Sequence, residues 1–212
     1  MRLPILALAV LAAACTSAAT RPASPPAASG AGWRAVATKS DRARLRDWRS
    51  SWMQALRQAR AAGHGVEIDA EGALLAPDAA LPGAVLPPGD YRCRTIKVGA
   101  QASRRAGGLE YITYPFFACA VGAANGGGVQ AFTKRTGSQR QIGWLYPDTG
   151  RRMVFIGTLQ LGDESAVLRY GKDRQRDLAG MVERVGDQRW RLALPAPYFE
   201  SLVDVIELVP AA

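Results

Sequence analysis

The sequence has little histidine: His64 is the single one in 212 residues. A Ser-His-Asp or Cys-His catalytic site would need this residue, and no Gly-x-Ser-x-Gly nucleophile motif occurs in the chain. His64 stands between two glycines, where we expect a loop after a helix. No histidine pair and no Asp-x-Asp spacing is present, so the sequence predicts neither a metal site nor a cofactor. The Gly126-Gly127-Gly128 run lacks the Gly-Lys-Ser/Thr of a phosphate loop and predicts a hairpin turn.

Long hydrophobic runs are also absent, apart from Leu3–Val10 near the N-terminus. This run follows Arg2 and is too short to span a bilayer, so residues 1–14 are expected to be a secretory signal peptide. The segment Leu11-Ala12-Ala13-Ala14-Cys15 resembles the lipobox of bacterial lipoproteins. That resemblance implies a lipid anchor on Cys15, and Thr16 after it favours the outer membrane, facing the periplasm. The alternative is ordinary signal cleavage, which gives a soluble periplasmic or secreted protein.

Cysteine is scarce, with three residues in the chain. If Cys15 carries lipid, Cys93 and Cys119 remain, and an oxidising compartment favours a disulfide between them. Both lie in expected strands with their neighbours on one pleated face. Such a bridge, closing about 25 residues, is expected to stabilise the domain by roughly 3 to 4 kcal/mol.

Residues 15–30 contain alanine, serine, threonine and proline with one charge, at Arg21. They cannot bury apolar surface, so we expect a disordered tether. Residues 31–212 are long enough for a single globular β-rich domain. The chain has a net charge of +9, and its basic residues are mostly arginine. A basic surface favours anionic partners, and an exported protein meets anionic lipids or acidic glycans rather than nucleic acid.

Residues 40–62 have the spacing of one long helix. Ser40 is the expected N-cap before Asp41. Apolar residues then recur every three or four positions, at Leu45, Trp48, Trp52, Leu56 and Ala59. This stripe is expected to pack on the core, and the helix to end near Gly63.

After the helix the pattern changes to short strands rich in β-branched and aromatic residues. The expected strands are 91–98, 111–121, 129–133, 153–161, 166–170, 178–185, 189–194 and 202–209. Turn signals at 125–128, 147–150, 162–163 and 186–187 separate several of them. The sequence therefore predicts a mainly β, α+β fold: an antiparallel β-barrel or barrel-like sandwich with the helix packed on it.

Four segments of the sequence resemble an uncharacterised bacterial family, domain of unknown function 4893. They are residues 86–94, 136–140, 154–157 and 205–210. The resemblance covers about residues 42–210 and implies an exported single domain without naming an activity. The signal segment, the cysteine pair and the Tyr-x-Cys strand start also resemble lysozyme-inhibitor lipoproteins, although lysozymes are themselves basic and would be repelled.

We expect a non-enzymatic binding module for an anionic envelope component. The candidate ligand contacts are Lys134, Arg135, Arg140, Trp144, Tyr146, Arg151 and Arg152. One alternative is a scaffold that binds another envelope protein, or an inhibitor of a lytic enzyme. Another is a glycan-processing enzyme that uses two carboxylates. The acids available to it are Asp163, Glu164, Asp173, Asp177, Glu183, Asp204 and Glu207, and their spacing selects no pair.

Overall fold

The computed structural model describes residues 32–101 and 110–211, and the expected signal peptide, lipidation site and tether lie outside them. Four α-helices and a 3-10 helix come first: α1 (Trp33–Val36), α2 (Lys39–Arg46), α3 (Trp48–Ala61), α4 (Gly65–Ala70) and η1 (Gly72–Leu74). The strands follow: β1 (Gly89–Ala100), β2 (Tyr111–Thr113), β3 (Phe117–Val121), β4 (Gln130–Lys134), β5 (Gln139–Thr149), β6 (Arg152–Leu161), β7 (Asp177–Gly186), β8 (Arg189–Pro195) and β9 (Ser201–Pro210).

The strands form a closed antiparallel barrel. Each strand from β3 to β8 pairs with the next one in the chain, and β9 pairs with β1 from Tyr91↔Pro210 to Ala100↔Ser201. The other edge of β1 is shared, because β3 pairs with its first half and β2 with Ile96–Val98. Eight strands therefore make the barrel, and β2 is an addition to its rim. The predicted β-rich barrel is confirmed.

Two apolar cores lie on either side of the barrel wall. Side chains alternate along each strand, so Trp190, Leu192 and Leu194 of β8 face the interior while Ala193 faces outward. The interior core includes the edge-to-face pair Phe132 and Phe155, whose ring centres are 5.8 Å apart. The outer core lies under the helices, which explains why β6 to β9 are buried on both faces.

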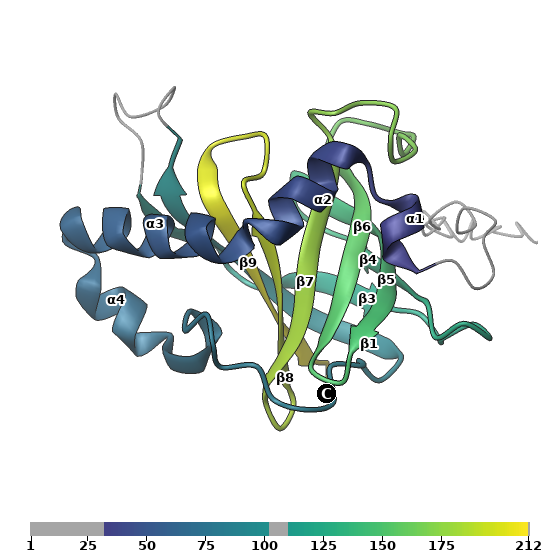
Figure 1. The fold of residues 1–212 in the computed structure, drawn as a ribbon, viewed down its shortest axis with the longest axis horizontal. Coiled ribbons are helices and arrows are strands. Elements are labelled where there is room, and N and C mark those ends of the chain that lie inside the picture. Colours follow the sequence, from purple (N-terminus) through teal and green to yellow (C-terminus); the bar gives the residue numbers. More distant parts are fainter. Residues whose placement is uncertain (1–31, 102–109, 212) are drawn as a thin grey trace, which may run out of the picture.

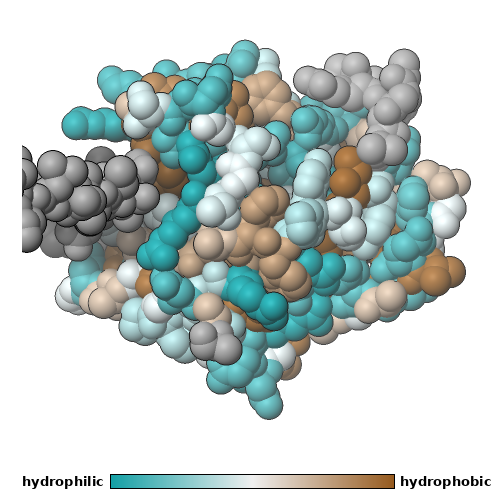
Figure 2. Space-filling model, turned by 180° about the vertical axis from the view of Figure 1, so that it is seen from behind, coloured by the Kyte–Doolittle hydropathy of each residue, from teal (hydrophilic) through white to brown (hydrophobic). Residues whose placement is uncertain are grey.

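The helices cover one side of the barrel (Figure 1). α2 packs on β7, and α3 packs on β1 and β9. Gly99 permits the close approach of α3, because a Cβ there would lie 2.9 Å from the Ala55 Cα atom. The opposite side carries hydrophobic areas interrupted by hydrophilic side chains (Figure 2).

The prediction of one long N-terminal helix is wrong. Asp47 ends α2 and begins α3, with φ −93° and ψ 11°, so the chain forms two short helices that follow different strands. The N-cap is Thr38 instead of Ser40: its hydroxyl oxygen accepts from the Asp41 N–H at 3.1 Å. The apolar stripe does face the barrel, with Trp52 and Ala59 fully buried.

Two predicted strands also differ from the structure, and one strand of the barrel was not predicted. Residues 111–121 form two strands, because the chain between them contains Pro115, which has no N–H for a ladder. Residues 166–170 lie in the loop between β6 and β7, where the Tyr170 hydroxyl accepts from the Thr38 N–H at 2.8 Å. Strand β5, at 139–149, was not predicted.

The two ends of the barrel differ. At one end Ala84 and Leu86 belong to the interior core, and the Gln130 side chain donates to the Leu86 carbonyl at 2.8 Å. We call this the closed end. The other end lies at the last residues of β1 and β4 and the first residues of β5 and β9. We call it the polar end.

Candidate functional site

The inward side chains of β1 change from apolar to polar toward the polar end. Tyr91 and Cys93 belong to the interior core, and Thr95 and Lys97 follow on the same face with 4 % exposure each. Lys97 lies opposite Asp204 of β9, which is also buried. The closed barrel therefore holds an ammonium group and a carboxyl group inside its wall.

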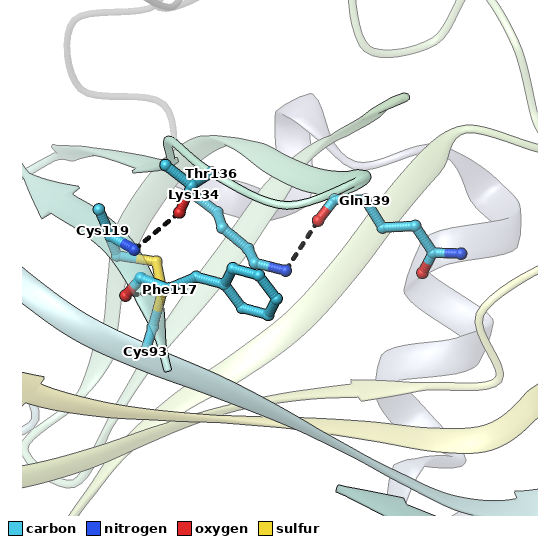
Figure 3. The surroundings of a disulfide bond; sticks show 7 residues. Cys93, Phe117, Cys119, Lys134, Thr136 and Gln139 are labelled. Carbon is cyan, nitrogen blue, oxygen red and sulfur yellow. Dashed lines mark hydrogen bonds between the residues drawn. A yellow bond between two sulfur atoms is a disulfide. The ribbon is translucent and has the colours of Figure 1, made fainter. Parts of the chain in front are cut away.

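A second lysine enters the same space from β4. Lys134 follows Phe132 on the inward face and is 4 % exposed. Its Nζ atom donates to the backbone oxygen of Gln139 at 2.9 Å and lies 4.4 Å from the centre of the Phe117 ring (Figure 3). Gln139 joins the two lysines, because its backbone oxygen accepts from Lys134 and its Oε1 accepts from Lys97 Nζ at 3.0 Å.

The two lysines are neutralised to different degrees. Lys97 forms ion-pair contacts with Glu200 in addition to its bond to Gln139. Burial alone would lower the pKa of Lys97, but Asp204 and Glu200 together raise it above its ordinary value. Burial lowers the pKa of Lys134 to about 8; Asp204 opposes this effect and Lys97 adds to it. Burial also raises the pKa of Asp204, against the attraction of Lys97.

Hydrogen-bonding capacity around Lys134 is left unused. An ammonium group carries three donors, and the described residues supply one acceptor to Lys134. On the inward faces of β1 and β5, Thr95 Oγ1 and Gln141 Oε1 are buried and have no partner among the described residues. Gln141 follows Gln139 on the inward face of β5. Buried polar atoms are nearly always bonded, so this cluster suits a polar ligand or ordered water.

The loop between β8 and β9 borders this cluster and is strained. Ala196 and Glu200 have φ values of 45° and 69°, in the left-handed region that disfavours side chains with a Cβ. Glu200 reaches Lys97, and it also lines an outer hollow of about 550 Å³ with Tyr198 and Phe199. The loop therefore lies between the buried lysine pair and the surface.

The predicted disulfide between Cys93 and Cys119 is confirmed, with Cα atoms 5.9 Å apart. It joins β1 to β3 next to Phe117, which lies against the Lys134 ammonium group (Figure 3). The Thr136 hydroxyl oxygen accepts from the Ala118 N–H at 2.9 Å in the same region. The bridge thus fixes the wall beside the polar cluster.

The seven residues predicted as ligand contacts are spread over the barrel. Lys134 lies inside it, while Arg135 is exposed and pairs with Asp90 at 2.8 Å. Arg140 donates to the Leu161 carbonyl at 2.9 Å. These three are close in sequence, but only Lys134 belongs to the polar cluster.

The other four lie toward the closed end or on the outer wall. Trp144 and Tyr146 pack in the outer core, and the Tyr146 hydroxyl has no partner among the described residues. Arg151 is exposed in the turn before β6. Arg152 pairs with Glu183 at 2.7 Å and lies 5.0 Å from the Trp48 ring centre. A ligand role for each of the seven stays a prediction.

Three of the seven acids considered for a glycan enzyme are paired with arginines. Glu183 binds Arg152 and Arg191, Glu207 binds Arg94 and Arg189, and Glu164 binds Arg176. Asp177 accepts from the Gly171 N–H at 2.8 Å, and burial raises its pKa. Asp204 alone of this set lies beside the lysine pair.

Sequence reasoning missed Thr95, Lys97, Gln141 and Asp204 as members of one site. The available signal was polar residues at inward positions of otherwise apolar strands, at a spacing of two. In 32–101 and 110–211, no group of three or more metal-ligating side chains is brought together. No helix in those ranges is long and apolar enough to cross a membrane.

A family model described as "Domain of unknown function (DUF4893)" matches residues 33–208, which cover the helices and nearly the whole barrel. No curated protein and no solved structure matches the chain.

Proposed function

The chain belongs to the family of domain of unknown function 4893, and we propose that it is a non-enzymatic binding module that holds the acidic group of an envelope component at Lys134. The observation that carries this proposal is the buried Lys134 ammonium group with one described acceptor. A buried charge that lacks partners costs stability, so its presence calls for a partner that arrives from outside.

The surrounding atoms favour an acidic sugar over a bare inorganic anion. A carboxylate accepts hydrogen bonds from the Lys134 ammonium group and from the Thr95 hydroxyl. The Gln141 Oε1 atom, in contrast, needs a donor, which a neighbouring sugar hydroxyl supplies. One ligand that carries a carboxylate beside hydroxyl groups would therefore satisfy all three.

Entry of such a ligand requires movement, because Lys97 and Lys134 are each 4 % exposed. The β8–β9 loop is the element suited to move: Ala196 and Glu200 are strained, and Glu200 bonds to Lys97. On opening, Glu200 leaves Lys97, and the ligand's acidic group takes its place near both lysines. Binding energy then offsets the separation of the Glu200–Lys97 pair.

The proposed cellular setting follows from the N-terminal segment. Its signal-like residues 1–14 and the lipobox-like Cys15 support export and a lipid anchor on the outer membrane. Acidic glycans and anionic lipids are the anionic components found there. A module on a tether would meet them on the periplasmic side.

The test is titration of the purified protein with glucuronate, with glucose as a neutral comparison. The wild type is expected to bind glucuronate at least tenfold more tightly than glucose, and Lys134→Met to weaken glucuronate binding at least tenfold. Lys39→Met removes one exposed lysine of α2 and is the matched control, which should bind as the wild type does. Equal glucuronate affinity in K134M and wild type would contradict the proposal.

A further inference from the structure

Four arginines surround a second hollow, on the outer wall of the barrel. It has a volume of about 330 Å³ and lies where α1 and α2 pack on β5, β6 and β7. Its lining includes Arg34, Arg42, Arg46 and Arg152, which we call the arginine groove. The helix elements α1 and α2 supply three of them and β6 supplies the fourth (Figure 1).

Two of these guanidinium groups are held in place by contacts that leave donors unused. Arg42 donates through Nη1 to the carbonyls of Ala37 and Arg34, at 2.5 and 3.0 Å. Arg152 uses Nε and one Nη2 hydrogen bond on Glu183 and lies over the Trp48 ring. A guanidinium has five N–H donors, so both retain donors for a ligand.

The other two arginines are open to solvent. The Arg34 and Arg46 side chains are each 71 % exposed. Arg34 lies 4.2 Å from the Trp33 ring centre, which orients it, and makes a 3.4 Å contact with Asp148. Arg46 contacts Asp47 at 3.4 Å. Exposed contacts of this length contribute little and are readily exchanged for a ligand.

Positive charge is in excess in the lining. Asp148 is the one acid among the lining residues, and its Oδ1 already accepts from the Trp33 indole N–H at 2.8 Å. Two acids outside the lining contact these arginines: Asp47 contacts Arg46, and Glu183 contacts Arg152. Glu183 is shared with the buried Arg191. An incoming anion would therefore meet several guanidinium groups and one engaged carboxylate.

We propose that the arginine groove binds a phosphate group. Guanidinium forks match the paired oxygens of phosphate, and phosphate presents enough oxygens for contacts from several arginines at once. The groove is formed by α1, α2 and the outer wall, whereas the lysine cluster is inside the barrel, so this site is independent of the one proposed above. Its ligand is a phosphate ester, either soluble or in a phospholipid headgroup.

The position of the groove beside the first described residue favours a phospholipid headgroup as the source of the phosphate. Residue 32, the first that the structure describes, directly precedes α1, whose Trp33 lines the groove. The sequence predicts a lipid anchor on Cys15, about 17 residues before α1, which would hold this side of the domain within reach of headgroups. Polybasic surfaces next to a lipid anchor strengthen attachment to anionic membranes.

The experiment compares two double variants of equal charge change. Arg34→Gln with Arg46→Gln alters exposed groove residues, and Arg49→Gln with Arg57→Gln alters exposed residues of α3 outside it. Glycerol phosphate is titrated against each protein while backbone amide shifts are followed by NMR. We expect shifts at residues 33–46 and 148–154, and a loss of affinity of tenfold or more in R34Q/R46Q but less than twofold in R49Q/R57Q.

A second measurement, with lipid vesicles, distinguishes a phospholipid headgroup from a soluble phosphate ester. If the protein co-sediments with phosphatidylglycerol vesicles, and R34Q/R46Q loses this while R49Q/R57Q keeps it, the site binds phospholipid headgroups. If the protein binds glycerol phosphate but does not co-sediment, the site binds soluble phosphate esters. Amide shifts elsewhere in the protein, or equal weakening in both double variants, would overturn the proposal. Lys134→Met leaves the groove unchanged and should bind both probes as the wild type does, so failure of one site is distinguished from failure of the other.

Discussion

At the scale of single residues, Lys134 is the clearest case of a side chain that opposes folding. Its ammonium group is buried with one described acceptor, and its pKa is lowered to about 8 by burial. Replacing such a group by an apolar side chain of similar volume commonly stabilises a protein by about 1 to 2 kcal/mol. We expect Lys134→Met to be more stable than the wild type at pH 7, measured by chemical unfolding, while it loses ligand binding.

The pH dependence of unfolding tests the same residue. With a folded pKa of about 8 and an ordinary value of 10.5, the unfolded state binds more protons between these values. Stability should therefore rise with pH across that window, and below pH 8 Lys134 should add no slope. Subtracting the curve of K134M from that of the wild type isolates this term, and Lys39→Met should leave it intact. A K134M curve parallel to the wild type would show that Lys134 is not buried as an uncompensated charge.

Gly157 is a second informative residue, because its surroundings leave no room for a side chain. It faces Gly143 across β5 and β6, and a Cβ on Gly157 would lie 2.4 Å from the Ile142 carbonyl oxygen and 2.5 Å from the Phe155 ring. Gly157→Ala is expected to lower the free energy of unfolding by about 3 kcal/mol, because the ring and the strand must both shift. Gly126→Ala, where a Cβ meets nothing within 4 Å, is the control and should change stability by less than about 0.5 kcal/mol.

At the scale of elements, the spacing of apolar residues did not predict the helix break at Asp47. Leu45, Trp48 and Trp52 continue the three- and four-residue spacing through the break, so the sequence predicts one helix. The break lets α2 follow β7 and α3 cross to β1 and β9. Which strand each helix packs on is a tertiary property that no local window of sequence contains.

Strand β5 was missed for a related reason. Its first residues, Gln139, Arg140 and Gln141, are polar, and Gly143 interrupts its centre, so the segment has a weak strand pattern. The strand forms because β4 and β6 pair with its two edges and Phe155 fills the space above Gly143. Strands with complete patterns, such as β7 and β8, were predicted to within a few residues.

One buried arginine ties the helical segment to the barrel. Arg191 of β8 is 0 % exposed, pairs with Glu183 at 2.7 Å, and donates to the carbonyls of Ala73, Leu74, Ala76 and Pro77. Lysine keeps the charge but cannot reach these acceptors together. Arg191→Lys should therefore destabilise the domain by about 3 kcal/mol in chemical unfolding. Arg57→Lys on the exposed face of α3 should be neutral, and a neutral R191K would show that the carbonyl contacts contribute little.

At the scale of the whole molecule, the sequence predicts the barrel and the Cys93–Cys119 bridge, yet it could not reveal the polar cluster. Thr95 and Lys97 lie on β1, Lys134 on β4, and Asp204 on β9, separated by up to 109 positions in the chain. Only the pairing of β1 with β9, which closes the barrel, and the inward facing of alternate residues bring them together. Of this cluster, Lys134 was the one residue predicted as a ligand contact, and Asp204 was named only among the acids available to a glycan enzyme.

The most direct test of a binding role at Lys134 is native mass spectrometry of the protein exported to the periplasm and purified gently at low salt. The wild type and Lys39→Met should retain an acidic component of defined mass, and Lys134→Met should lose it. A wild-type protein that is bare, or a K134M protein that retains the same component, would contradict ligand binding at the polar end of the barrel.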